Sequence, residues 1–219
     1  MDSIPQKIPA HEIVYRNIRD QILYGDLPPG QPVTIQGLVE NLEVSMTPVR
    51  EAIRRLTAEG ALEFQGNRRV CVPQMGEKRF AELVFARRHI EPKLAELASV
   101  NMNGQFVHKL KAIDLQLDEA IAKGDVQGYM CHNHRFHFAL YAQSNSQVLL
   151  PMAKTLWLRY GPLSRIICGQ TGTQNLADHH EEAMESIARR DHKATANAIR
   201  TDIEQGFEIV RNSTGWSGI

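Results

Sequence analysis

Apolar residues recur every three or four positions along most of this chain, which is the spacing of helices with one buried face. Over the first 75 residues the pattern predicts three helices, at His11–Tyr24, Ile35–Leu42 and Ser45–Gly60. After Gly60 the pattern changes to alternating apolar and polar residues around Gly66 and Asn67, which predicts a two-stranded hairpin with a tight turn. A helix–turn–helix followed by a hairpin, the wing, is therefore predicted for this part of the chain.

The helix over Ser45–Gly60 has faces with different tasks. Its start is well marked, because the Ser45 hydroxyl can accept a bond from a free backbone N–H and Pro48 has no N–H to lose in the first turn. The apolar stripe along one face consists of Val49, Ile53 and Leu56. The residues off that stripe near the N-terminus are Met46, Thr47 and Arg50. A DNA-recognition helix is built in this way, since it is held by its apolar face and contacts base edges near its N-terminus.

Helical periodicity continues through the rest of the chain, with no strand-like alternation. The predicted segments are 80–97, 105–123, 126–143, 147–167, 177–190 and 192–210. Pro92 could interrupt the first of them, and Gly161 with Pro162 could bend or break the fourth. Six or seven helices with short loops predict an antiparallel all-α bundle over residues 76–219. The predicted fold class is mostly α, with a winged helix–turn–helix at residues 1–75 before the bundle.

Composition and charge narrow the classes of protein that remain. The chain has 219 residues, 42% of them hydrophobic, which is enough for two cored domains, and it has no apolar run long enough to span a bilayer. Its N-terminus is unlike a signal peptide, and its three cysteines form neither a CxxC pair nor a disulfide framework, so we expect a cytoplasmic protein. The net charge is zero, yet five arginines and three acids lie between Ser45 and Arg69, which predicts a local basic face for DNA.

The run YRNIRDQILYGDLPPG, followed by VSMTPVREAIRRLTAEG and the hairpin, resembles the winged helix–turn–helix domain of the GntR family of bacterial transcription regulators. The resemblance implies a homodimer that binds a pseudo-palindromic double-stranded DNA operator. The residues that it places at the DNA are Gln36, Ser45, Met46, Thr47, Arg50, Arg54, Arg55, Gly66, Asn67, Arg68 and Arg69. Met46 stands where the family usually has an arginine, and Gln36 where some members have one, so we expect an altered DNA specificity.

The second half of the chain resembles the FCD ligand-binding domain of the FadR-like branch of that family. The resemblance rests on the pieces RRHIEPKLA, NHRFHFALYAQSN, HxxxMxxIARRD and the closing helix. In the family such domains bind small carboxylates, often beside a metal ion held in the bundle core. The resemblance therefore implies a small carboxylate effector and a divalent metal ion.

Four residues are candidates to hold that metal. Asn133 and His137 are four apart and share one helical face. Two antiparallel helices folded at Asp191 would place His180 beside Asp202. Imidazoles and a carboxylate suit Zn²⁺, Ni²⁺ or Mn²⁺, with the Asn133 amide a weak donor. The matching family positions are an acid or asparagine and three histidines, so Asp202 departs from the pattern. The alternative is that both histidines are buried and hydrogen-bonded without a metal.

Arg87 is a candidate for binding the effector. It lies four residues before Glu91 and matches an arginine that in the family often faces the effector carboxylate, which a guanidinium can hold with two hydrogen bonds. The alternatives are a salt bridge or a solvated position. The predicted effector-binding residues are Arg87, Asn133, His137 and His180. The residues expected at the surface or as partners of the ligands are His132, His134 and His179.

These observations predict a sequence-specific DNA-binding transcription regulator, by family analogy a repressor, that responds to a small carboxylate. The motifs GxSxG, HExxH and the Walker loop are missing, which argues against an enzyme. Two alternatives stay open, a metal-dependent enzyme and an architectural DNA-binding dimer that senses nothing.

Overall fold

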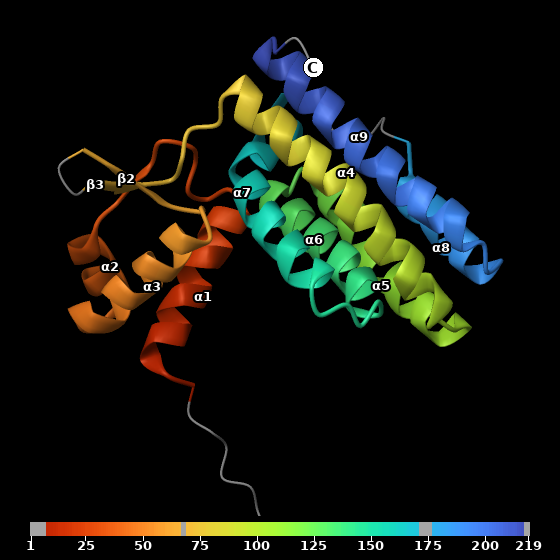
Figure 1. Cartoon of the computed structure of the whole chain (residues 1–219), viewed down its shortest axis with the longest axis horizontal. Coiled ribbons are helices and arrows are strands. Elements are labelled where there is room, and N and C mark those ends of the chain that lie inside the picture. The colour runs from red at the N-terminus through yellow and green to blue at the C-terminus, as the bar shows by residue number, and fades with distance from the viewer. Residues whose placement is uncertain (1–7, 67–68, 171–176, 217–219) are drawn as a thin grey trace, which may run out of the picture.

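The computed structural model describes residues 8–66, 69–170 and 177–216, and for residues 165–170 the backbone alone. We call the described residues up to 75 the head and those from 76 the bundle. The head has three helices and a small sheet, and it rests against the six helices described in the bundle (Figure 1). This arrangement confirms the predicted fold class. None of the described helices combines the length and the apolar character needed to cross a membrane.

The head contains, in chain order, α1 (Ala10–Leu23), β1 (Pro32–Val33), α2 (Ile35–Leu42), α3 (Met46–Ala58), β2 (Glu63–Gln65) and β3 (Arg69–Cys71). Its strands pair antiparallel in the order β1–β3–β2, and β3 pairs through Val70 with both neighbours. The hairpin of β2 and β3 is the predicted wing. The sequence does not predict β1, because a strand of 2 residues is too short to show alternation. Asn67 and Arg68 lie outside the described residues.

Helix–turn–helix geometry in the head comes from α2 and α3. Thr34 caps α2 as predicted, since its Oγ1 accepts the N–H of Gly37 at 3.1 Å. Glu43 ends α2 in the left-handed region, with φ 51°, and turns the chain toward α3. Ser45 occupies the N-cap position of α3, but its side chain makes no capping bond, so the predicted hydroxyl cap is wrong. Pro48 lies in the first turn, where a missing N–H costs nothing.

The bundle contains α4 (Glu77–Val100), α5 (Gly104–Lys123), α6 (Val126–Ala142), α7 (Leu149–Gln170), α8 (His179–Ala188) and α9 (His192–Thr214). In Figure 1, α4 and α9 run side by side along one edge of the bundle. Pro92 and Pro162 lie inside α4 and α7, both of which are continuous, so the predicted interruption of α4 and the predicted break of α7 are wrong, while the alternative of a bend at Gly161 and Pro162 stays a prediction. The fully buried side chains at the centre of the bundle include Leu94, Phe136, Leu140, Tyr141 and Ile199.

One bundle helix, α7, also completes the core of the head. The buried residues that α1 and α3 contribute to that core include Val14, Ile18, Ile22, Val49, Ile53 and Leu56. Trp157 and Leu158 of α7 belong to the same apolar cluster. Arg159 donates from Nε to the carbonyl oxygen of Glu59 at 2.9 Å, which fastens the end of α3 to α7. The head and the bundle therefore share a packed junction centred on α7.

Candidate functional site

Three potential metal ligands converge between α6, α8 and α9. His137 on α6 and His180 on α8 are 1% and 5% exposed, and their Nε2 atoms lie 3.3 Å apart. Asp202 on α9 places Oδ2 3.1 Å from the Nε2 of His137 and Oδ1 3.9 Å from the Nε2 of His180. The three ligand atoms all lie within 4.8 Å of one another. We call these residues the His–His–Asp cluster. The turn at Asp191 brings His180 and Asp202 together, as their spacing predicts.

Hydrogen bonds behind the cluster decide which ring nitrogens carry protons. Tyr141 donates its hydroxyl proton to Glu91 at 2.8 Å, so its oxygen accepts the Nδ1–H of His137 at 3.0 Å. The Nδ1 of His180 donates to the Asp114 carboxylate at 2.7 Å. A neutral imidazole has one N–H, so both Nε2 atoms then present lone pairs to the centre of the cluster. Partners that fix the far nitrogen in this way are typical of histidines that bind metals.

Burial and neighbouring charges set the protonation of the cluster. Burial lowers the pKa of His137 and keeps its ring neutral. Burial also acts to lower the pKa of His180, but the bond to Asp114 and the charge of Asp202 outweigh it, and the pKa is raised. Burial acts to raise the pKa of Asp202, but its close contact with His137 and the other nearby histidines lower the pKa to about 2. Asp202 is therefore ionised at neutral pH, and without a metal a proton on His180 relieves the converging lone pairs.

The charge of this region favours a divalent cation. The buried or partly buried carboxylates are those of Glu91, Asp114 and Asp202, and the guanidinium of Arg87 balances one of them. With neutral imidazoles two negative charges remain, which one divalent ion would neutralise. Two imidazole nitrogens and a carboxylate oxygen also suit Zn²⁺, Ni²⁺ or Mn²⁺, with a position left open for a ligand. The donor set therefore fits such an ion.

Arg87 is buried in an ion pair with Glu91, one helical turn later on α4. Its Nε and Nη2 donate to the two carboxylate oxygens, the second at 3.2 Å, and Trp157 donates its indole N–H to Glu91 at 2.8 Å. The guanidinium carbon lies 4.5 Å from the ring centre of Trp157 and 4.4 Å from that of Tyr160. The salt bridge that the sequence leaves as an alternative is therefore present. Because a guanidinium has five N–H groups, this pairing does not use all of them.

Two spaces adjoin the cluster. The inner cavity, of about 40 Å³, has Arg87 and His137 on its wall, and the outer pocket, of about 180 Å³, has His180. The residues that line both spaces are Tyr129, Asn133, Asp202 and Gln205. The structure thus brings every predicted effector- and metal-binding residue to one place between α4, α6, α8 and α9.

The remaining histidines of the bundle differ from one another. His179 lines the outer pocket, and His132 is half-buried on α6. His134 is half-buried as well, and among the described residues it makes no hydrogen bond to the His–His–Asp cluster. Its ring lies 5.5 Å from that of Trp157 and 6.0 Å from that of Tyr24 at the end of α1, so it belongs to the junction with the head. Burial there lowers the pKa of His134 to about 3.

At the candidate DNA interface, the N-terminal end of α3 is open to solvent. Met46 is 52% exposed, and its sulfur lies 3.9 Å from Nη2 of Arg50. Ser45, Thr47 and Arg50 are exposed beside it. Gln36 is exposed on α2 and donates to Glu40 at 3.2 Å. In the wing, the exposed residues that the sequence predicts at the DNA are Gly66 and Arg69.

Two neighbouring arginines of α3 have different surroundings. The side chain of Arg54 is 78% exposed. Arg55 instead folds back onto the head, where its guanidinium carbon lies 3.6 Å from the ring centre of Tyr15. It also donates to Glu59 at 3.1 Å and to Glu12 at 2.9 Å. Of these two predicted phosphate-binding residues, Arg54 has the freer approach to DNA, while Arg55 joins α1 to α3.

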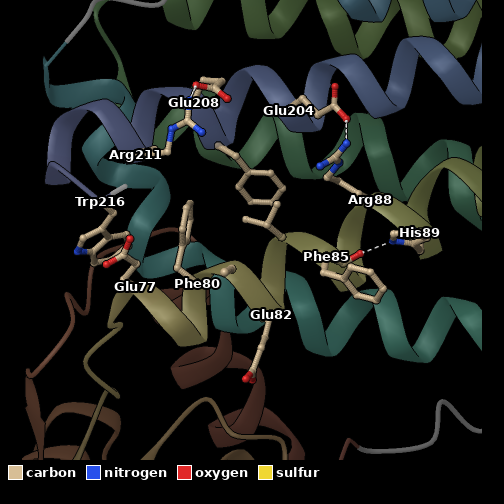
Figure 2. A pocket seen from close by; sticks show the side chains of 13 residues that line it. Glu77, Phe80, Glu82, Phe85, Arg88, His89, Glu204, Glu208, Arg211 and Trp216 are labelled. Carbon is tan, nitrogen blue, oxygen red and sulfur yellow. Dashed lines mark hydrogen bonds and ion pairs between the residues drawn. The ribbon is translucent and has the colours of Figure 1, made fainter. Parts of the chain in front are cut away.

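A larger pocket, of about 560 Å³, lies on the outer face of α4 and α9 (Figure 2). Its wall includes Phe80 and Trp216, whose ring centres lie 5.1 Å apart, and Phe85, which is 67% exposed. Arg88 in the same wall is paired with Glu204 at 2.6 Å, as Figure 2 shows. This pocket shares no residue with the His–His–Asp cluster among the described lining residues.

The groups that orient the cluster leave no clear mark in the sequence. Asp114 is 66 positions from its partner His180, and no local pattern marks it. Tyr141 lies one helical turn after His137, a spacing that could have suggested the contact. Glu91 is noted only as the residue four after Arg87, whereas it joins Arg87, Tyr141 and Trp157 in one buried network.

Comparison with known proteins finds relatives for both halves of the chain. The sequence model for bacterial regulatory proteins of the gntR family matches residues 10–72, and that for the FCD domain matches residues 82–205. The HTH-type transcriptional regulator McbR of Escherichia coli (strain K12) is 28% identical over 200 residues, which cover 90% of each chain. The HTH-type transcriptional repressor GlaR of the same organism is 22% identical over 214 residues, 91% of this chain and 94% of its own.

A solved structure matches the fold over nearly the whole chain. The structure of E. coli McbR/YncC has a TM-score of 0.88 at 26% sequence identity. The match covers 94% of this chain and 99% of that chain. Head and bundle together therefore follow an architecture known from a solved protein.

Proposed function

The chain belongs to the gntR family of bacterial regulatory proteins and carries an FCD domain behind its head, and from this we propose that it is a repressor whose affinity for DNA is controlled by a small carboxylate bound beside a divalent metal ion. Its relatives are transcription regulators, among them the repressor GlaR. The observation that carries the sensing half of the proposal is the His–His–Asp cluster, whose ligand atoms lie within 4.8 Å of one another.

We assign DNA recognition to the exposed N-terminal end of α3. In a cytoplasmic homodimer, each head would occupy one half-site of a pseudo-palindromic operator. Thr47 and Arg50 would enter the major groove, Arg54 would contact phosphate, and Arg69 in the wing would approach the backbone. Met46 cannot make a charge-assisted bond to guanine or phosphate. Each subunit therefore has one such contact fewer than a family member with an arginine at this position. We therefore expect moderate affinity with a marked dependence on salt.

We assign binding of the carboxylate effector to the His–His–Asp cluster and to the inner cavity and outer pocket beside it. A divalent ion bound there would supply a Lewis-acid contact for a carboxylate oxygen. Arg87 lines the inner cavity and has N–H groups beyond those used by Glu91, so it can donate to the same carboxylate. The Asn133 amide lines both spaces and can donate as well.

Helix α7 would carry the signal to the head. Trp157 donates to Glu91, and its ring lies 5.0 Å from that of His137, so it touches the sensing site. Trp157 and the adjacent Leu158 also belong to the core of the head. A ligand that shifts the Arg87–Glu91 pair therefore acts on the helix that supports the head. For this to regulate DNA binding, the ligand must have different affinities for the two head arrangements.

A gel shift with purified protein tests the proposal. The metal content of the native chain is measured first, and DNA affinity is then titrated with small carboxylates. We expect bound metal, loss of that metal in the double variant His137→Ala with His180→Ala, and weaker DNA binding when the effector is added. A native chain without metal would refute the metal half of the proposal. DNA affinity unchanged by every acid tested would refute the sensing half.

Two further measurements separate the other functional classes. A carboxylate that binds only the native state raises its stability, so thermal stabilisation distinguishes a sensor from an architectural dimer. Turnover of the bound acid would instead indicate a metal-dependent enzyme. We expect stabilisation without product.

A further inference from the structure

A pocket of about 410 Å³ lies between the head and the bundle, and we call it the junction pocket. One wall comes from the head, at positions 60, 61, 72, 73 and 75, and the other comes from α4 and α7. Its described lining residues include none of the His–His–Asp cluster. Sites for small ligands usually have volumes of about 300–1,000 Å³ and are common where two domains meet. The size and the place of the junction pocket both suit a small ligand.

Apolar side chains form most of this lining. Ala61 and Val72 of the head and Leu83 and Leu158 of the bundle are buried at its walls. Ala86 of α4 is half-buried beside them. Apolar surface gains free energy when it leaves water, so such walls favour a ligand with an apolar body.

The charged residues of the described lining are two arginines and one glutamate, Arg79, Arg159 and Glu82. Glu82 balances one of the two positive charges. The partner of Arg79 in the wing is Glu63, and the 3.6 Å between their charged atoms is too long for a hydrogen bond. A ligand with one negative charge matches the remaining positive charge.

Arg159 connects this pocket to the C-terminal end of α3. Its Nε donates to the carbonyl oxygen of Glu59, the C-cap residue of α3, at 2.9 Å. The guanidinium lies against the backbone of Gly60, where an added Cβ would be 2.7 Å from Nη2. A guanidinium has five N–H groups, and the described residues accept only one from Arg159. Its Nη groups can therefore donate to an anion in the pocket.

We propose that the junction pocket is a second ligand site, which takes a small apolar molecule with one anionic group. The anionic group accepts hydrogen bonds from the Nη groups of Arg159. The apolar body packs between Ala61 and Val72 on the head side and Leu83 on the bundle side. Because this ligand contacts both the head and the bundle, its affinity depends on their relative placement, and by linkage its binding changes the affinity for DNA.

This inference goes beyond the proposed function, since the site needs neither the metal ion nor the carboxylate effector. Only its effect on DNA rests on the proposed DNA binding.

Calorimetry on the full chain tests the site with 2-naphthoate and 2-naphthamide, which share one apolar body and differ in charge. We expect 2-naphthoate to bind about tenfold more tightly, because only its hydrogen bonds to Arg159 join two charged groups. Arg159→Gln should remove most of that preference. Ala86→Leu fills part of the pocket without changing any charge, and it should weaken binding of both probes by about tenfold or more.

Two matched controls lie on α4 in the larger pocket on the outer face of α4 and α9. Ala81→Leu repeats the substitution at another half-buried alanine, and Arg88→Gln repeats the loss of charge at another exposed arginine. Neither residue lines the junction pocket. We expect both variants to keep the binding and the preference, and removal of metal with a chelator to leave them unchanged.

Equal binding of the two probes overturns the inference, as does a preference that survives Arg159→Gln or a lack of 2-naphthoate binding at about 1 mM. Binding that is weakened by Ala81→Leu and not by Ala86→Leu would place the probe in the larger pocket. Binding that is lost with the metal would place it at the cluster. Either result also overturns the inference.

Gel shifts test the effect on DNA. Saturating 2-naphthoate should change operator affinity even in the double variant His137→Ala with His180→Ala, which lacks two of the proposed metal ligands. If the probe binds the junction pocket and operator affinity stays the same, the link to DNA binding is overturned. If the chain binds no operator under any condition, the proposed function falls, while the calorimetry still decides whether the site exists.

Discussion

Substituting Gly161 tests whether α7 supports the head as closely as the structure indicates. A Cβ at this position would lie 2.4 Å from the carbonyl oxygen of Leu23 and 2.7 Å from its Cα, whereas ordinary contacts begin at 3.4 Å. The obstructing atoms are backbone, so no rotamer change can relieve the contact. In Gly161→Ala, α1 and α7 must therefore move apart by about 1 Å, the gap between these distances.

Two effects oppose each other in this variant. Alanine is favoured over glycine inside a helix by about 1 kcal/mol. Overpacking in a closely packed interior costs about 1–3 kcal/mol, and a backbone clash falls at the upper end or beyond. We expect a net loss of about 2 kcal/mol of unfolding free energy, which lowers the melting temperature of a chain of this size by about 4–8 °C. Thermal and urea unfolding measure the loss, and a separate early transition would mark release of the head.

Gly104→Ala is the control for helix propensity. Gly104 is the first residue of α5, and a Cβ there would meet nothing within 4 Å. The same substitution should therefore leave stability unchanged or raise it by up to about 1 kcal/mol. If Gly161→Ala proves as stable as Gly104→Ala, the close contact between α1 and α7 does not exist and the reasoning is refuted.

Three other perturbations address the junction and the DNA interface. His134 has a pKa of about 3 in the folded chain against 6.5 unfolded, so the unfolded state binds the extra proton and stability falls as pH drops below 6.5. Between pH 6.5 and pH 5, the free energy of unfolding of the native chain, measured with urea, should fall by about 2 kcal/mol more than that of His134→Gln. If the unfolding free energies of the two proteins change with pH in parallel, His134 is not buried in the folded chain. Arg54→Ala should weaken DNA binding without changing stability, whereas Arg55→Ala should lower stability by about 1–2 kcal/mol through lost contacts with Tyr15. If gel shifts and unfolding curves instead show that Arg55→Ala weakens DNA binding and Arg54→Ala lowers stability, the two arginines have the opposite roles. Met46→Arg should add one phosphate or base contact per subunit and steepen the salt dependence of operator binding, and an unchanged slope would mean that this position does not face DNA.

The sequence predicts local features of this molecule well and distant ones poorly. Amphipathic periodicity predicts helices because each buries one face, and the helix–turn–helix follows from that pattern with the caps around it. The approach of His180 to Asp202 follows from two helices folded at a single turn, a geometry that spacing alone defines. Packing defines the remaining contacts. The inward turn of Arg55 depends on Tyr15, 40 positions earlier, and no pattern within α3 reveals it.

Prolines illustrate the same limit. A proline inside a helix removes one hydrogen bond, and the sequence therefore predicts an interruption of the first bundle helix and a bend or break in the fourth. In the structure α4 and α7 continue through Pro92 and Pro162, both of which are buried against neighbouring helices. Tertiary packing can outweigh such a local preference. The sequence of one helix does not show how neighbouring helices will pack against its proline.

The position of Trp157 gives the protein an optical reporter of its own sensing site. The chain has 2 tryptophans. The indole of Trp157 bonds to Glu91 and lies 5.0 Å from the ring of His137, whereas Trp216 packs on Phe80 at the far end of α4. In Trp216→Phe, fluorescence excited at wavelengths that only tryptophan absorbs would therefore come from a single indole beside the cluster. A paramagnetic ion such as Mn²⁺ or Ni²⁺ bound there would quench its emission, so occupancy can be followed without a label.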